Sequence, residues 1–300
     1  MLILSGGLLA AIDILLAPTI TAAPSIARRM PAVTSYPTDR NDRSAPPISA
    51  AIICLNEEHN ISCCLDALSW CDEIVVVDSG STDRTLQIVE RFNGTKVLYR
   101  RFDTYIAQKN FALDHCQHDW VLSVDADEIL PGKLIEEIQG LSFDVAGYFV
   151  GRRSFLGDQE IKYGSWNPDY KLRLFRRSVG RWGGSNPHER VLLEGPTQRL
   201  TTRMLHYSYR TRQEFLDRNR KYMRMLVEHQ SRPDKRTYLG EPILHGWGNF
   251  VKSYILRRGF LDGPAGLYIA YHMARLSYEK HSLLARKTKE FQTSPMRRSA

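Results

Sequence analysis

The chain has 300 residues, of which 43% are hydrophobic and 10% aromatic, enough apolar material for a sizeable core in one large domain. It contains no repeat of solenoid or propeller period and no low-complexity segment, which excludes repeat and fibrous architectures. Lys and Arg number 41 against 33 Asp and Glu, and the formal charge of +8 favours an acidic partner such as a nucleic acid, an anionic membrane or a phosphorylated substrate.

Residues 1–46 differ in composition from the rest of the chain. The apolar stretch 2–17 is interrupted by Asp13, is shorter than the ~20 residues that span a bilayer, and has no Lys or Arg before it as a secretory signal would. Residues 18–47 are rich in Pro, Ser, Thr and Ala, a composition typical of linkers. We expect an N-terminal extension that is either disordered or a weak membrane anchor.

From Ile48 onward, short apolar runs alternate with segments of helical spacing. Strands are predicted over 48–55, 73–78, 96–99 and 120–124, and helices over 61–69, 85–92 and 106–115. This alternation is typical of βαβ units, so we expect an α/β fold with a central, mostly parallel sheet flanked by helices.

The five cysteines in this part of the chain indicate a reducing environment. They are odd in number, all lie between Cys54 and Cys116, and form neither a CxxC pair nor a zinc-ligand spacing. We therefore expect free thiols that pack as small apolar side chains in a cytosolic protein.

Beyond residue 140 the pattern is looser. A strand is predicted over 145–152, one helix over 213–232, and two more helices over 243–259 and 265–286. The last two mix aromatic residues with Lys and Arg, which is typical of helices lying on a membrane surface and equally of amphipathic helices packed on a domain. We expect a main domain over 47–235 and a helical C-terminal region over 236–300 whose membrane association stays open.

Polar residues follow three of the predicted strands, at the points where those strands end. They are Asn56 with Glu57, Asp78 with Asp83, and Asp125 with Asp127. Ligands of open α/β sheets bind beyond the carboxyl ends of the strands, so these side chains should converge on one crevice. The chain has neither a GxGxxG fingerprint nor a P-loop, and a divalent cation held by carboxylates would supply the missing counter-charge for phosphates. The D-x-D pattern ends at Asp127, and a helix is expected to start after Glu128.

Four motifs stand in the order and spacing of glycosyltransferase family 2, which this chain resembles. They occupy 52–58, 75–83, 108–110 and 124–128. The later segments 168–175, 187–190, 205–209 and 259–266 resemble one branch of that family, the lipopolysaccharide core β-1,4-glucosyltransferases of Gram-negative bacteria. The resemblance implies the GT-A fold, a nucleotide-diphospho-sugar donor and an inverting, metal-dependent reaction. It leaves residues 1–45 uncovered.

The resemblance also implies roles in donor binding. Asp78 would bind the uracil, Lys109 would lie near the base or the phosphates, Asp125 would touch the ribose, and Asp127 would bind Mg²⁺ or Mn²⁺. The backbone near Asn56 and Glu57 would line the base pocket, although Ile53-Cys54-Leu55 departs from the Pro-Thr-Tyr of many relatives. Asp83 either belongs to this pocket or caps the helix that begins near Thr85. His206 would be a further metal ligand or contact the diphosphate, and Arg173 and Arg176 would face phosphates.

The catalytic base is the least determined assignment, because the Glu-Asp pair that many relatives carry after the D-x-D motif is missing. Inversion by direct displacement needs one carboxylate to accept the proton of the acceptor hydroxyl. Glu189 is the candidate, since it stands in a polar and aromatic segment, and Asp169 is the rival. Either could instead be a surface carboxylate paired with Arg190 or Lys171.

The leading hypothesis is an enzyme that transfers a hexose, with glucose as the first candidate, from a UDP-sugar to a lipopolysaccharide inner-core sugar or another glycolipid. It would work in the cytoplasm as a peripheral protein on the inner face of the inner membrane, without a nucleic-acid partner. One alternative is a nucleotidyltransferase, although Asn56-Glu57-Glu58 stands where such enzymes need a glycine-rich, basic loop. Another is a non-catalytic basic module that binds a membrane or a nucleic acid.

Overall fold

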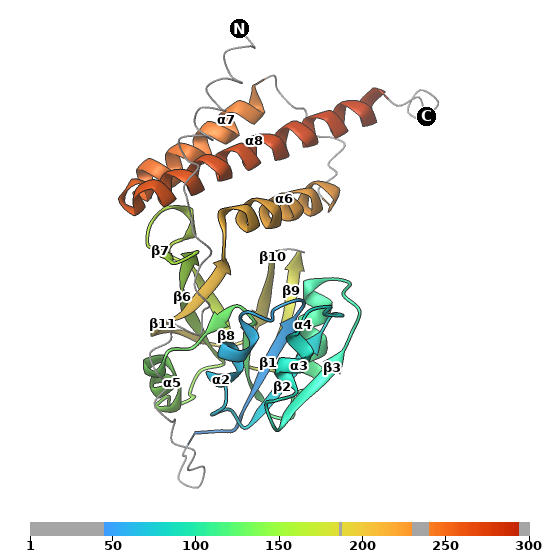
Figure 1. The fold of residues 1–300 in the computed structure, drawn as a ribbon, viewed down its shortest axis with the longest axis vertical. Coiled ribbons are helices and arrows are strands. Elements are labelled where there is room, and N and C mark those ends of the chain that lie inside the picture. Colours follow the sequence, from blue (N-terminus) through green and yellow to red (C-terminus); the bar gives the residue numbers. More distant parts are fainter. Residues whose placement is uncertain (1–44, 186–187, 230–239, 294–300) are drawn as a thin grey trace. The chain divides into compact units, whose positions relative to one another are not determined.

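The computed structural model describes residues 45–185, 188–229 and 240–293 (Figure 1). These divide into two compact units. The first, here called the sheet unit, comprises residues 45–155 and 168–208, and the second, the helical unit, comprises 156–167 and the described residues from 209 onward. The predicted division after residue 235 stays a prediction, and the predicted N-terminal extension lies almost entirely outside the described residues.

One half of the central sheet is parallel and follows the predicted elements closely. Its strands stand in the order β3-β2-β1-β4, and all three pairings are parallel. The strands are β1 (Ile48–Cys54), β2 (Glu73–Asp78), β3 (Thr95–Tyr99) and β4 (Trp120–Asp125), joined through the helices α2 (Ile61–Asp66), α3 (Thr85–Val89) and α4 (Tyr105–Asp114). Helices cover these strands, so β1, β2 and β4 need continuous apolar runs, and this is the signal that predicted them.

The other half of the sheet is antiparallel and was largely missed from the sequence. Within the described residues it completes a nine-stranded sheet, with β8 antiparallel to β4 and β6 antiparallel to β8. Its strands are β5 (Glu128–Ile129), β6 (Gly147–Leu156), β7 (Gln159–Ile161), β8 (Tyr170–Arg176) and β11 (Thr197–Tyr209). A separate pair is formed by β9 (Gly180–Ser185) and β10 (His188–Leu193). The predicted α/β class with a parallel core is confirmed.

The helix expected after Glu128 begins later than predicted. Glu128 lies in β5, where it is the register partner of His206 in β11, and the helix α5 (Gly132–Gln139) starts only after Pro131. Proline has no N–H to give to a preceding turn, and its fixed φ suits the position just before a helix. The residues between the D-x-D motif and α5 are therefore extended, which places Glu128 against β11.

Two apolar clusters fill the two faces of the sheet. Ala50 and Ile52 point into one and Ala51 into the other, as the alternation of side chains along a strand requires. All five cysteines are buried and free, as predicted: Cys54, Cys63, Cys64, Cys71 and Cys116.

The helical unit consists of elements that pack on a core of their own. They are η3 (Gly164–Trp166), α6 (Arg212–His229), α7 (Glu241–Phe250), a π-helix η4 (Val251–Leu256), η5 (Gly259–Asp262) and α8 (Gly263–Thr293). Tyr268 and Ile269 of α8 pack against Phe215 of α6, so α8 is an amphipathic helix packed on a domain rather than one whose apolar face lies on a membrane. No helix in the described part of the chain is both long and apolar enough to cross a bilayer.

Candidate active site

The predicted polar residues meet at one edge of the sheet. Asp78 at the end of β2 is the register partner of Cys54, and Asp125 at the end of β4 is the register partner of Ile53. Both carboxylates therefore flank the carboxyl end of β1, one on each side. Their position at adjacent strand ends is the one predicted, and the single crevice beyond these ends stays a prediction.

The loops after β1 and β2 are tied together by hydrogen bonds. Asn56 adopts a left-handed backbone conformation (φ 57°), which Asn tolerates better than most residues. Its amide N–H donates to Ser81 Oγ over 2.9 Å, and its Oδ1 accepts from the N–H of Thr82 over 2.8 Å. The N–H of Glu57 donates to Thr85 Oγ1 over 2.8 Å. These hydrogen bonds hold the two loops together beside the predicted crevice.

Asp78 is buried and is surrounded by donors from its own loop. Its carboxylate accepts from the N–H groups of Gly80 (2.8 Å) and Ser81 (2.9 Å) and from the Ser81 hydroxyl. The Cys54 thiol also donates to it over 3.7 Å. The position is the one predicted, and the contact of Asp78 with uracil stays a prediction.

Asp83 caps the turn before α3. It accepts from the N–H and the hydroxyl of Thr85 and from the N–H of Glu58 (3.1 Å). Burial alone would raise the pKa of Asp83, but these hydrogen bonds outweigh it and lower the pKa below its ordinary value. The N-cap of α3 is Arg84, so Asp83 stabilises the turn before the helix without being its N-cap residue. Its place in the donor pocket stays a prediction.

Asp125 is the centre of an ion-pair network. Its carboxylate contacts Lys109 Nζ at 2.9 Å and the buried guanidinium of Arg173. Burial would raise the pKa of Asp125, yet these two cations hold it well below its ordinary value. Both oxygens of Asp125 are engaged by cations, and the predicted division of roles between Asp125 and Asp127 stays a prediction.

Glu128, to which the sequence assigned no role, holds this network in place. Its side chain is fully buried, and one carboxylate oxygen contacts Arg173 and Arg152 Nη1, the latter at 3.1 Å. The other oxygen accepts from the backbone N–H of Asp125 over 3.0 Å. Glu128 therefore fixes both the backbone of the D-x-D motif and the cation that pairs with Asp125. The only available signal was its position three residues after Asp125.

Asp127 and His206 face each other, with Asp127 Oδ1 3.7 Å from His206 Nε2. His206 Nδ1 contacts the hydroxyls of Ser208 (2.9 Å) and Ser154 (3.3 Å), and the Ser208 hydroxyl also lies 3.2 Å from Nε2. Burial, together with the nearby positive charge of Arg152, lowers the pKa of His206 to about 3, so the imidazole is neutral. A carboxylate oxygen and a neutral nitrogen at this separation would suit a divalent cation as ligands, and the cation would supply positive charge for the diphosphate.

Glu189 is joined to the donor side through Lys109. Lys109 Nζ lies 3.2 Å from Glu189 Oε1 and 4.3 Å from the centroid of the Trp182 ring. Two hydrogen bonds between the Asn110 amide and the Trp182 backbone (2.9 and 3.0 Å) hold this indole against α4. The second oxygen of Glu189 is buried and has no hydrogen-bond partner among the described residues. That oxygen is available to accept a proton.

Asp169, the rival base, is committed to structural ion pairs. Arg152 Nε donates to it over 2.7 Å, and Lys171 Nζ lies 3.4 Å away, so the predicted pairing with Lys171 is confirmed. Burial would raise the pKa of Asp169, but Arg152 and Lys171 lower it below its ordinary value. Both oxygens of Asp169 are engaged by these cations. The ion pair of Glu189 is with Lys109 rather than Arg190.

The two arginines predicted to face phosphates lie in different places. Arg173 is buried between Asp125 and Glu128, so its charge first neutralises the carboxylates of the site. Arg176 is the register partner of Trp120 at the other end of β4, and its guanidinium lies 5.3 Å from the Trp120 ring centroid. The prediction for Arg176 is therefore wrong. Arg176 lies beside the first residue of β4, whereas the D-x-D motif follows the last.

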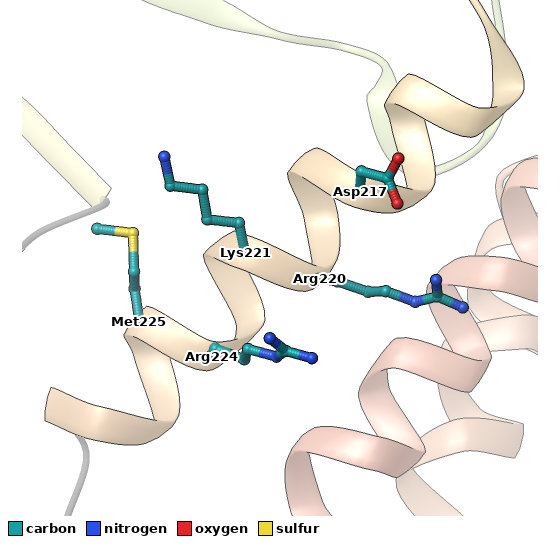
Figure 2. Close-up of a pocket in the computed structure, with 5 residues that line it drawn as sticks. All are labelled: Asp217, Arg220, Lys221, Arg224 and Met225. Carbon is teal, nitrogen blue, oxygen red and sulfur yellow. The ribbon is translucent and has the colours of Figure 1, made fainter.

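A separate pocket lies on α6 in the helical unit (Figure 2). It has a volume of about 440 Å³ and is lined by Asp217, Arg220, Lys221, Arg224 and Met225. Figure 2 shows the Arg220 and Arg224 side chains extending from the helix in the same direction. The three cations form no ion pair with any described residue, and this excess of positive charge suits an anionic ligand. None of these residues was singled out from the sequence.

The chain matches known glycosyltransferases in sequence. Residues 49–189 match the profile of the family described as glycosyl transferase family 2. The chain is 33% identical to the lipopolysaccharide core biosynthesis glycosyltransferase LpsC of Rhizobium meliloti over 261 residues, which cover 80% of this chain and 95% of the relative. It is also 43% identical to the uncharacterized glycosyltransferase RC0292 of Rickettsia conorii over 93 residues, or 31% of this chain and 33% of the relative.

Likeness to solved structures is looser. Staphylococcus aureus TarS 1-349 in complex with UDP aligns with a TM-score of 0.42 and 15% identity, covering 82% of this chain and 91% of TarS. Glucosyl-3-phosphoglycerate synthase of Mycobacterium tuberculosis, solved with Mn²⁺, UDP and phosphoglyceric acid, aligns with a TM-score of 0.31 and 25% identity over 37% of this chain and 44% of that one. At these TM-scores neither likeness supports a conclusion about function. The match to LpsC over nearly its whole length, together with the family profile across the donor site, makes this chain a glycosyltransferase that belongs to glycosyl transferase family 2.

Proposed function

We propose that this glycosyltransferase transfers a hexose, with glucose as the first candidate, from a UDP-sugar to a sugar of the lipopolysaccharide inner core or a related glycolipid, with inversion at the anomeric carbon. The observation that carries the proposal is the chain of contacts from Asp125 through Lys109 to Glu189. It joins a carboxylate of the predicted donor site to a carboxylate whose other oxygen is buried without a hydrogen-bond partner in the described part of the chain. The name of the relative LpsC supports a lipopolysaccharide acceptor.

Glu189 is the proposed catalytic base. Its unpartnered oxygen accepts the proton of the acceptor hydroxyl while the hydroxyl oxygen attacks the anomeric carbon, and the bond from that carbon to the diphosphate breaks. Lys109 Nζ, 3.2 Å from the other oxygen of Glu189, holds the carboxylate in place. Direct attack of this kind gives a product of inverted configuration, since no covalent glycosyl-enzyme forms.

Asp127 and His206 are the proposed protein ligands of Mg²⁺ or Mn²⁺. A bound divalent cation would neutralise the charge that develops on the departing UDP. The hydroxyls of Ser208 and Ser154 orient the His206 ring, so that Nε2 is directed at Asp127.

The basic pocket on α6 is a proposed site for anionic groups of the acceptor. Inner-core sugars carry carboxylates or phosphates, and Arg220, Lys221 and Arg224 offer three unpaired cations. An acceptor that presents its anionic groups to a glycosyltransferase of this kind is embedded in a membrane, so we also propose a peripheral position on the cytoplasmic face of the inner membrane.

A transfer assay tests this function. Purified full-length protein is incubated with UDP-glucose, Mg²⁺ or Mn²⁺, and lipopolysaccharide truncated in the inner core, and the product is analysed by mass spectrometry and NMR. A product heavier by one hexose with a β linkage supports the proposal, and an α linkage contradicts inversion. If the acceptor gains no hexose from any UDP-sugar, the acceptor assignment is wrong. The double variant Arg220→Gln/Arg224→Gln should raise the KM for the acceptor without changing that for the donor.

A further inference from the structure

Consecutive elements of the helical unit expose a run of large apolar side chains, here called the docking surface. They come from α7, the π-helix η4 and η5, and each is between 47% and 74% exposed: Ile243, Leu244, Trp247, Ile255, Leu256, Phe260 and Leu261. Soluble monomers expose single apolar residues routinely but seldom a cluster of this kind, and such clusters mark sites of interaction with proteins or membranes.

The docking surface is continuous along the chain. Ring centroids lie 6.3 Å apart for Trp247 and Phe250, 5.3 Å apart for Phe250 and Tyr254, and 6.2 Å apart for Tyr254 and Phe260. These aromatic contacts link α7 through the π-helix to η5. Trp247 and Phe260 are thus linked through the half-buried rings of Phe250 and Tyr254, and the exposed residues lie on consecutive elements that pack on one another.

Buried polar anchors hold this strip in position. Ser253 Oγ accepts from the N–H of Ser165 over 3.2 Å, and the carboxylate of Asp262 accepts from the N–H groups of Lys162 (3.1 Å) and Tyr163 (2.8 Å). A Cβ on Gly259 would come within 2.7 Å of the carbonyl oxygen of Ser253, so only glycine allows this close approach. Phe260 and Leu261 are thus presented outward by a fixed backbone.

The exposed charges beside the η4 and η5 part of the strip are positive, whereas Glu241 at the start of α7 lies 3.6 Å from His245. Between residues 242 and 278 the only acidic residue is Asp262, and it is buried. Lys252, Arg257 and Arg258 are all exposed, and they lie beside Ile255, Leu256 and Phe260 in the sequence. An apolar strip flanked by cations is complementary to the interface of a bilayer that carries anionic lipids.

We propose that the docking surface binds the interfacial region of an anionic lipid bilayer, with its apolar side chains at the boundary of the acyl chains and its three cations at the headgroups. This differs from the sequence-based expectation, which included the second helical segment 265–286, because α8 buries Tyr268, Ile269 and Leu276 in the protein. The inference extends the proposed peripheral location, and it depends on neither the sugar donor nor the acceptor.

Flotation of the full chain with vesicles tests the inference. Vesicles of phosphatidylcholine alone are compared with vesicles that also contain phosphatidylglycerol, and the fraction of protein that floats gives a partition coefficient. Leu244→Ser/Leu256→Ser changes the two most exposed apolar residues of the strip, 74% and 73% exposed, and should lower the coefficient roughly tenfold or more. Lys252→Gln/Arg257→Gln should lower it roughly tenfold on anionic vesicles only. The matched control Val97→Ser/Val179→Ser changes exposed apolar residues of the sheet unit and should float like the wild type.

Three results would overturn the inference. The wild type could fail to float with anionic vesicles, or the Leu244→Ser/Leu256→Ser variant could float as well as the wild type. Alternatively, the wild type could be a dimer that this variant converts to a monomer without loss of flotation, in which case the strip is an interface between copies of the chain. UDP release from a UDP-sugar without vesicles is measured in parallel, so that failure of docking and failure of glycosyl transfer are distinguished.

Discussion

Side chains of alternating charge line the predicted donor site, and each charged group is paired with its neighbours of opposite charge. Lys109 stands between Asp125 and Glu189, and Arg173 stands between Asp125 and Glu128. Buried charges are tolerated only when they are paired, so each carboxylate of this row depends on a neighbouring cation. Asp127 pairs with His206, whose imidazole is neutral, which is the arrangement that leaves a net negative charge for a metal ion.

Replacement of Glu189 by Gln tests its role as base. The amide keeps the shape of the side chain but cannot take up a proton, so turnover should fall about 10²- to 10⁴-fold. UDP affinity, measured by calorimetry, should change little. Glu194→Gln, at an exposed position beyond β10, serves as the control and should keep wild-type turnover. A larger loss of turnover in Asp169→Asn than in Glu189→Gln would assign the base to Asp169 instead.

Removal of the metal ligand should uncouple UDP binding from metal. In the wild type, Mn²⁺ should strengthen UDP binding and chelation should abolish turnover, because the cation neutralises the diphosphate. In Asp127→Ala, UDP affinity should be the same with and without Mn²⁺, and turnover should be lost. His118→Ala changes an imidazole outside the site and is the control. An Asp127→Ala variant that still binds UDP more tightly with Mn²⁺ would show that the metal lies elsewhere.

Arg173 should matter for stability as well as for donor binding. Arg173→Met leaves Asp125 and Glu128 short of a buried counter-charge and should lower the free energy of unfolding by about 3–5 kcal/mol. The exposed pair of Arg181 with Asp114 offers a control, and Arg181→Met should cost at most about 1 kcal/mol. Urea denaturation measures both. Equal losses in the two variants would contradict the central position of Arg173.

The ion pair between Arg173 and Asp125 also makes the stability of the protein depend on pH. The pKa of Asp125 is lower in the folded than in the unfolded protein. Its ion pair therefore stabilises the fold fully at pH values above the pKa of about 3.9 in the unfolded chain. This stabilisation is lost as the pH falls through the lower pKa of the folded protein. Wild-type stability should therefore drop steeply below about pH 4, and the drop should be shallower in Arg173→Met.

At the scale of elements, the parallel half of the sheet could be predicted because its strands are buried on both faces. Runs such as Ile74 to Val77 read as strands without reference to the rest of the chain. In β10 and much of β11, half-buried positions alternate with exposed and charged ones, which gives a weak signal. The strand that carries His206 was therefore missing from the predicted fold. The strand that carries Arg173, β8, was missed because Lys171, Arg173 and Arg176 interrupt its apolar run, although four of its residues are buried in succession.

Some features of the candidate site could likewise be predicted from the sequence, and others could not. The position of the D-x-D motif could be predicted, since it directly follows the apolar run of β4. The contacts of Glu128 with Arg152 and of Lys109 with Glu189 could not, because each joins residues 24 or 80 positions apart through antiparallel elements that were not foreseen. Tertiary contacts of single charged residues leave no periodicity in a sequence.

Close packing between η5 and α8 gives a prediction for the helical unit. A Cβ on Gly266 would lie 1.9 Å from the carbonyl oxygen of Gly259, so Gly266→Ala forces the backbone apart and should destabilise this unit by about 1–3 kcal/mol. Gly248→Ala in α7 meets no atom within 4 Å and should stabilise by up to about 1 kcal/mol, as alanine usually does in a helix. Hydrogen exchange of α8 would show both effects, and a neutral Gly266→Ala would contradict this packing.

At the scale of the whole molecule, the proposed sites fall in different units of the chain. The sheet unit contains the predicted donor site, with Asp125, Asp127 and Glu189, while the helical unit contains the basic pocket on α6 and the docking surface. The helical unit also includes 156–167 and α6, which the sequence had placed in the main domain. Segments so distant in the chain can be assigned to one unit only from their packing, such as the contact cluster that contains both Phe215 and Ile161.

The central claim is that the network around Asp125 and Glu189 serves transfer of a sugar from a UDP-sugar. A screen of UDP release across UDP-sugars, with and without truncated lipopolysaccharide, tests it most directly. We predict that one UDP-sugar gives metal-dependent UDP release. The acceptor should stimulate this release, and Glu189→Gln should suppress it at least about a hundredfold. Release of pyrophosphate instead of UDP, or equal turnover in Glu189→Gln and the wild type, would contradict it.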